Sequence, residues 1–108
     1  MEFIETSVFT KRITEYPDDD YRLLQKELAL NPKAGKVIKG TGGLRKIRWN
    51  TPGKGKSGGL RVIYYNLTES TILMVFAFRK NEAENITDEE AHTLKALTQQ
   101  IKKQVLKK

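Results

Sequence analysis

The sequence has no cysteine and only one histidine, so several kinds of chemistry are excluded at once. Without cysteine there are no disulfide bonds, no thiolate zinc sites and no cysteine nucleophile. A metal site would have to rest on carboxylates, and these do not cluster at the spacing of metal ligands. His92 lies outside the apolar stripe of its segment and is expected to be a solvent-exposed helix residue. We therefore expect neither a metal nor a cofactor.

Long apolar runs are missing as well. The longest, residues 72–78, has seven residues and is too short to cross a bilayer. The first five residues have neither the basic start nor the apolar stretch of a signal peptide, so we expect a cytoplasmic protein without a membrane partner. With 108 residues, of which 38% are hydrophobic, the chain can build one core but not two. We therefore expect a single domain over residues 1–108.

Acidic residues are absent from the middle of the chain. No Asp or Glu occurs between Glu27 and Glu69, and residues 33–62 contain nine Lys or Arg residues. The net charge of +7 is thus concentrated in one segment of 30 residues. Such a density of one sign repels itself unless a polyanion lies against it. A solvated basic face explains the cluster equally well when it is considered alone.

The first third of the chain is predicted to form a strand and then a helix or helix pair. Residues 2–9 alternate loosely and predict a strand, and residues 10–15 can form a short helix before the main one. Acidic residues at 18–20 mark the start of an amphipathic helix, which Asn31 and Pro32 end.

Three antiparallel strands and a final helix are predicted to follow. The strands are expected over residues 44–49, 60–65 and 72–78, with a turn at residues 66–70. The last helix begins with a capping box of Thr87 and Glu90. Its predicted buried stripe consists of Leu94, Leu97, Ile101 and Val105. The predicted fold class is α+β, with a small, twisted, mostly antiparallel sheet, an N-terminal helix or helix pair and a C-terminal helix.

Basic residues occur on the predicted strands with the spacing of one sheet face. Lys46 and Arg48 share a face of the first central strand, and Arg61 stands at the start of the next strand. Lys80 and Glu82 follow the third. Because the end of one strand lies beside the start of its hairpin partner, Arg61 and Lys80 are expected to meet near Lys46 and Arg48. The alternative is that Lys80 and Glu82 are ordinary polar residues leaving a strand.

A cationic concavity with one carboxylate suits RNA better than DNA. RNA carries its own nucleophile, the 2′-hydroxyl, which attacks the adjacent phosphate without a metal. The protein must then help to remove the hydroxyl proton, neutralise the charge on the phosphorane oxygens and protonate the leaving 5′-oxygen. Arginine binds phosphate in a rigid bidentate manner, and lysine can serve as a charge or as an acid or base.

Five short motifs stand out along the chain, namely PKAG at 32–35, GTGGLRKIR at 40–48, GKGKSGG at 53–59, RVIYY at 61–65 and KNE at 80–82. They occur in the order seen in bacterial RelE/HigB-type toxins, and the chain resembles the HigB branch most. The resemblance implies a single toxin domain that enters the ribosomal A site beside 16S rRNA and cuts messenger RNA there. It also implies a cognate antitoxin, with a helix-turn-helix DNA-binding domain, that holds the toxin inactive.

The resemblance assigns roles to individual residues. Lys46 and Arg48 match the paired basic residues that contact the messenger backbone, and Arg61 matches the arginine that holds the scissile phosphate. Lys80 and Glu82 match the lysine of the terminal strand motif and the acid that often follows it. The remaining cations expected to bind RNA are Arg45, Lys54, Lys56 and Arg79.

The sequence departs from the family pattern at two positions near Lys80. Asn81 stands where some relatives have arginine, and Phe78 stands where many have tyrosine. A tyrosine that serves as acid or base in some members has no clear counterpart. The identity of the proton-transferring group therefore stays open. Two other functions also stay open, namely a gyrase-inhibiting toxin similar to ParE and a non-catalytic module that binds RNA or the ribosome.

Overall fold

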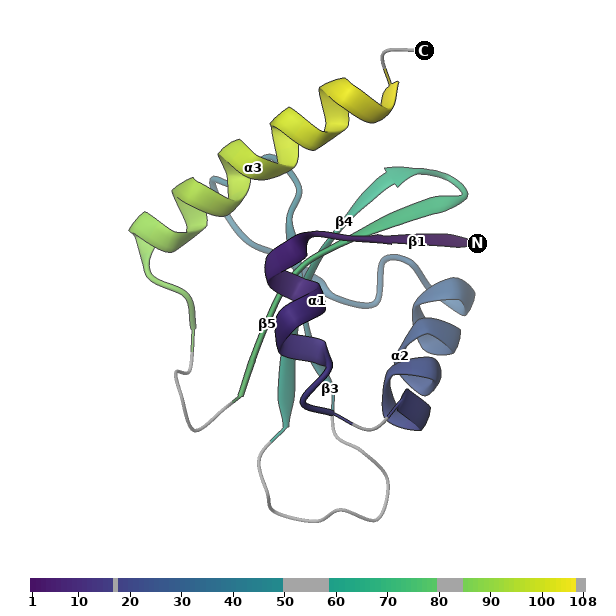
Figure 1. Ribbon diagram of the computed structural model, residues 1–108. Coiled ribbons are helices and arrows are strands. Elements are labelled where there is room, and N and C mark those ends of the chain that lie inside the picture. Colours follow the sequence, from purple (N-terminus) through teal and green to yellow (C-terminus); the bar gives the residue numbers. More distant parts are fainter. Residues whose placement is uncertain (17, 50–58, 80–84, 107–108) are drawn as a thin grey trace.

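The computed structural model describes residues 1–16, 18–49, 59–79 and 85–106. Its elements run in the order strand, two helices, four strands and a long helix (Figure 1). They are β1 (Glu2–Glu5), α1 (Ser7–Ile13), α2 (Asp18–Leu30), β2 (Lys36–Val37), β3 (Arg45–Trp49), β4 (Leu60–Thr68), β5 (Thr71–Arg79) and α3 (Asp88–Leu106). The predicted α+β class is confirmed. None of the helices in the described ranges is long and apolar enough to span a membrane.

One five-stranded sheet, in the order β1-β5-β4-β3-β2, organises the molecule. Only β1 runs parallel to its neighbour, β5, and the other pairs are antiparallel. The helices α1 and α2 pack on one face through Phe9, Leu24 and Leu28. The helix α3 packs on the other face, where Leu94 joins the second buried cluster. The sheet is therefore covered on both sides, which explains why β5 is an almost continuous apolar run.

The first strand is shorter than the sequence predicts, and Thr6 is the reason. Its side-chain oxygen accepts a hydrogen bond from Phe9 N at 3.0 Å, and its hydroxyl donates to Val75 O at 2.8 Å. This N-cap starts α1 at Ser7, so the predicted strand is wrong over residues 6–9. Phe9 and Ile13 then fall one helical turn apart and are buried together in the α1/α2 cluster.

The other predicted boundaries hold with smaller changes. The β4–β5 hairpin runs through Thr68 and resumes at Thr71, so its turn is tighter than the predicted residues 66–70. The capping box of α3 is confirmed, with Glu90 N donating to Thr87 Oγ1 at 3.0 Å and Thr87 N donating to Glu90 Oε1 at 2.8 Å.

The buried stripe of α3 differs from the prediction at one position. Leu94 is buried, and Ile101 and Val105 pack partly against the second cluster. Leu97 is only half-buried, and Thr98 is buried in its place. The Thr98 hydroxyl is satisfied inside the helix, because it donates to Leu94 O at 2.8 Å. His92 is exposed, as predicted.

Because Thr6 both caps α1 and bonds to Val75 O, replacing it should destabilise the fold. We expect Thr6→Ala to lower the free energy of unfolding by about 2 kcal/mol, because it removes an N-cap and a buried hydrogen bond together. Chemical denaturation followed by the fluorescence of Trp49, the single tryptophan, measures the change. Thr14→Ala, at the exposed threonine that caps the other end of the same helix, should stay within about 0.5 kcal/mol of the wild type. A Thr6→Ala variant as stable as the wild type would show that the cap contributes nothing.

Candidate nucleic-acid interface

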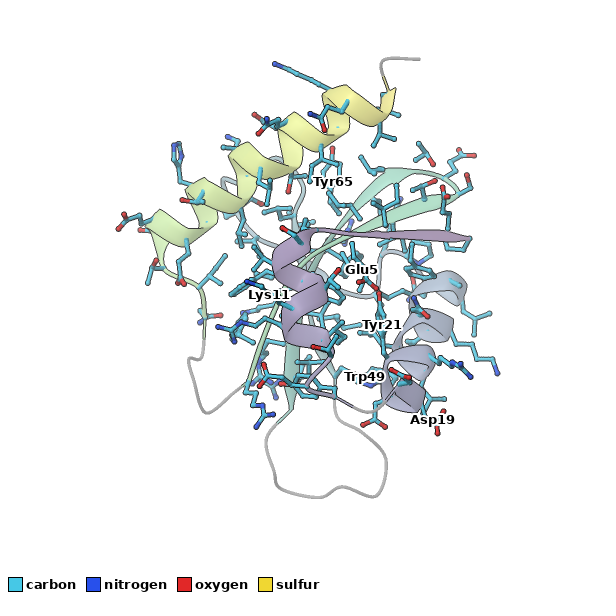
Figure 2. All side chains as sticks on the ribbon, in the orientation of Figure 1. Glu5, Lys11, Asp19, Tyr21, Trp49 and Tyr65 are labelled. Atoms are coloured by element: carbon cyan, nitrogen blue, oxygen red, sulfur yellow. The ribbon has the colours of Figure 1, made fainter. Side chains whose placement is uncertain are left out.

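The two faces of β3 have different chemistry, as the sequence predicts. Ile47 and Trp49 pack against the cluster formed with α1 and α2. Lys46 and Arg48 alternate with them and therefore point to the face that α3 partly covers. Figure 2 shows Trp49 beside α2 and Tyr65 beneath α3, on the two sides of the sheet.

The sheet register brings further cations next to Lys46 and Arg48. Arg48 on β3 lies directly opposite Arg61 on β4, and Lys46 lies opposite Lys36 on β2. Residues directly opposite one another share a face, and like charges in such positions destabilise a sheet. Stability alone therefore does not favour this arrangement. A bound polyanion would remove the repulsion.

These side chains line a cleft of about 750 Å³. Its described lining residues are Ala34, Lys36, Lys46, Ile47, Arg48, Arg61 and Asn85. This lining contains four cations and neither a carboxylate nor an aromatic ring. The sequence predicts a cationic concavity at this place, with Glu82 as its one carboxylate, and Glu82 lies outside the described residues.

Arg61 is the most deeply buried of the four cations. It is only 5% exposed, in a strand where its neighbours Leu60 and Val62 are also buried. Within the described residues, its Nη1 atom has no hydrogen-bond acceptor although that atom is buried. A buried guanidinium nitrogen without a partner is costly, and the cost falls when an anion supplies the acceptor. Arg61 therefore provides a prepared contact for an anionic group entering the cleft.

Lys46 has a neutral partner. Its Nζ atom donates a hydrogen bond to Oδ1 of Asn85, which precedes α3 and lines the same cleft. The contact orients the ammonium group without neutralising its charge. Sequence reasoning missed both Asn85 and Lys36. No local sequence pattern marks Asn85, because its role depends on its tertiary contact with Lys46. Lys36 could have been identified only if the two-residue strand β2 had been predicted.

Two predicted RNA-binding residues lie away from the cleft. The Nη1 atom of Arg45 donates to the carbonyl oxygens of Gly35, at 2.7 Å, and Lys33, at 3.3 Å. Arg79 donates from Nε to the hydroxyl of Tyr16 at 3.1 Å, and its guanidinium stands 5.1 Å from the centre of that ring. In the sheet register, Arg45 lies opposite Tyr64 and Arg79 lies opposite Leu60. Tyr64 and Leu60 both belong to the cluster that packs against α1 and α2. The cleft is on the other face, so the structure does not bring Arg45 and Arg79 to it.

Four predicted site residues fall outside the described residues. They are Lys54, Lys56, Lys80 and Glu82. Their roles stay predictions from the sequence. Among the residues that are described, no three His, Cys, Asp or Glu side chains are grouped to hold a metal ion. The donors that are present, two guanidinium and two ammonium groups, are suited to phosphate oxygens.

Comparison with known proteins agrees with this geometry. The chain is similar in structure to the toxin RelE of E. coli, solved in the free state as a double mutant, with a TM-score of 0.56 and 15% sequence identity. The match covers 77% of this chain and 86% of that one, and it establishes the shared fold. Residues 23–108 match the family described as the RelE toxin of the RelE/RelB toxin–antitoxin system. The chain therefore belongs to the RelE toxin family.

Proposed function

We propose that this toxin is an endoribonuclease that depends on the ribosome and cuts messenger RNA in the A site, as a member of the HigB branch. The observation that carries the proposal is the buried Nη1 atom of Arg61, which has no acceptor among the described residues and belongs to a side chain that lines a cationic cleft. A phosphodiester of the RNA backbone would supply that acceptor. The surrounding Lys36, Lys46 and Arg48 would attract the polyanion.

The proposed reaction uses only groups of the RNA and the protein. The 2′-hydroxyl loses its proton, and its oxygen forms a bond to the adjacent phosphorus while the bond from phosphorus to the 5′-oxygen breaks. The products are a 2′,3′-cyclic phosphate and a 5′-hydroxyl, so atoms and electrons balance without a metal or a redox partner. Arg61 and Arg48 would stabilise the negative charge that develops on the phosphorane oxygens.

The proton must be accepted by one group and supplied by another. Lys46 is our candidate base, because the family resemblance implies that it contacts the messenger backbone and its Nζ atom, hydrogen-bonded to the neutral Asn85, lies in the same cleft as Arg61. Lys80 and Glu82 are the candidates for the group that protonates the leaving oxygen, as the family resemblance implies. Tyr64 is not a candidate, since it is fully buried on the opposite face of the sheet.

The lining of the cleft also supports the need for a ribosome. No aromatic side chain is present among its described lining residues, so these residues offer no ring on which a base could stack. They are suited to hold a phosphate backbone rather than to orient a nucleotide. We infer that the ribosome, including 16S rRNA, supplies the orientation, and that purified protein is nearly inactive on free RNA.

Family membership implies a cognate antitoxin. We propose that it carries acidic side chains that cover the basic segment 33–62, together with a helix-turn-helix DNA-binding domain. The acidic side chains of the antitoxin would pair with the same cations as RNA and would therefore compete with RNA for the cleft. The site of action would be the cytoplasm, where messages are translated.

Loss of the phosphate site should abolish toxicity. We expect Arg61→Ala and Lys80→Ala to relieve growth arrest when the protein is induced in cells, whereas Arg22→Ala, at an exposed arginine of α2, leaves it intact. Mapping of message ends should reveal cuts within codons on translating ribosomes. Intact messages with altered DNA supercoiling would instead indicate a gyrase inhibitor, and neither effect would indicate a non-catalytic RNA- or ribosome-binding module.

The same arginine should lower the stability of the free protein. We expect Arg61→Leu to raise the free energy of unfolding by about 1 kcal/mol, because it replaces a buried, incompletely paired charge by an apolar side chain. Chemical denaturation without RNA measures this difference. A decrease of more than about 1 kcal/mol would mean that the guanidinium has a structural partner, and the assignment of Arg61 to phosphate would then be wrong.

A further inference from the structure

The buried Tyr64 is hydrogen-bonded to residues 32–35, the segment that contributes Ala34 to one wall of the cleft. The hydroxyl of Tyr64 donates a hydrogen bond to Pro32 O and accepts one from Gly35 N, each at 2.8 Å. Asn66, two residues further along β4, donates to Pro32 O at 3.2 Å. These bonds attach residues 32–35, which have no ladder of their own, to the middle of the sheet.

Arg45 completes this attachment by donating to the carbonyl oxygens of Gly35 and Lys33. Gly35 approaches the sheet so closely that a Cβ atom there would lie 2.8 Å from Tyr64 Cε1 and 2.9 Å from Lys46 O. Only glycine fits such a position. We call the contacts of Tyr64 and Arg45 with residues 32–35 the wall clamp.

The wall clamp does not depend on a titrating group near neutral pH. Burial raises the pKa of Tyr64, although the Gly35 N–H and the Arg45 charge act in the opposite direction. The phenol therefore keeps its proton and continues to donate to Pro32 O.

The wall clamp determines the position of Lys36, the residue that directly follows the clamped segment 32–35. Lys36 begins β2, which has only two residues, and it lies opposite Lys46 on the cleft side of the sheet. Two residues of ladder are a weak anchor on their own, so the position of Lys36 depends on the clamped segment before it. Lys36 is exposed and lines the cleft together with Ala34.

We propose that Lys36 is a further phosphate contact of the RNA site, and that the wall clamp of Tyr64 and Arg45 positions it. The inference rests on the proposed function in that RNA is taken as the ligand. Lys36 lies opposite Lys46, which lies opposite Ile63, and Arg61 is two residues from Ile63 along β4. The backbones of Lys36 and Arg61 are therefore two strands and two residues apart, a distance of roughly 12 Å. A buried guanidinium and an exposed ammonium at this separation are suited to different phosphates of one strand. Lys36 thus binds the backbone beside the phosphate that Arg61 holds.

The test measures the binding of a short, labelled single-stranded RNA to the full-length protein by fluorescence anisotropy over a range of salt concentrations. We expect Lys36→Ala to weaken binding roughly fivefold at low salt and to reduce the slope of log K against log salt by about 0.7, as for one lost contact with a single strand. Lys39→Ala is the matched control, because it removes the same charge from an exposed lysine that is not among the described lining residues.

The positioning role of Tyr64 needs a second comparison. Tyr64→Phe removes the hydroxyl but no charge, and we expect it to weaken binding roughly threefold while Trp49 fluorescence reports a folded chain. In the variant that combines Lys36→Ala with Tyr64→Phe, the two effects should not add, because the clamp acts through Lys36. A purely structural role of Tyr64 would give additive losses and would overturn the clamp.

The outcomes separate this inference from the proposed function. If the wild type binds RNA and Lys36→Ala behaves like Lys39→Ala, Lys36 is not a phosphate contact and the inference fails alone. If Lys36→Ala has the expected effect but wild-type protein cuts no message on ribosomes, the proposed function fails and the binding site stands. A wild type without affinity for RNA at low salt contradicts both.

Discussion

The pleat of the central strands is the constraint on which the rest of the structure depends. In both β3 and β4, alternate side chains point to opposite faces of the sheet. The direction of each side chain is fixed, because one of the two faces is buried against α1 and α2. Once Ile47 and Trp49 are committed to that core, Lys46 and Arg48 must face the other way. A shift of the register by one residue would bury both cations, so hydrophobic packing on one side determines where positive charge appears on the other.

The apolar pairing of the central strands also offsets the repulsion between the cations of the cleft. Arg48 and Arg61 are placed opposite one another, and Arg61 is buried as well. Such a pair would disfavour strand association in an isolated hairpin. Here β4 is paired along its length with β5, whose buried side chains contribute to both clusters. The free energy of that pairing compensates for the repulsion, which an anion in the cleft would then relieve.

The sequence reveals those parts of the molecule that follow from periodicity or from local capping. The alternation at residues 44–49, the helix start at Asp18 and the capping box at Thr87 are local patterns, and all three predictions are confirmed. The extent of β1 could not be predicted from alternation, because Thr6 ends the strand by capping α1 at Phe9 N while its hydroxyl contacts Val75, far away in the chain. The same is true of two residues of the cleft: Lys36 and Asn85 reach it through pairings that become visible only when the sheet is assembled.

Arg45 illustrates why a basic residue in a basic segment is not automatically a ligand contact. It neighbours Lys46 in sequence, yet the pleat places its side chain on the opposite face, where two backbone carbonyl oxygens accept hydrogen bonds from its Nη1 atom. Its charge still has a use there, since two carbonyl oxygens are satisfied and residues 32–35 are held against the sheet. Neighbouring cations of one strand therefore have two different tasks in the structure: Lys46 and Arg48 line the cationic cleft, whereas Arg45 holds residues 32–35 against the sheet. The net charge of the segment alone cannot distinguish these tasks, whereas the direction of each side chain can.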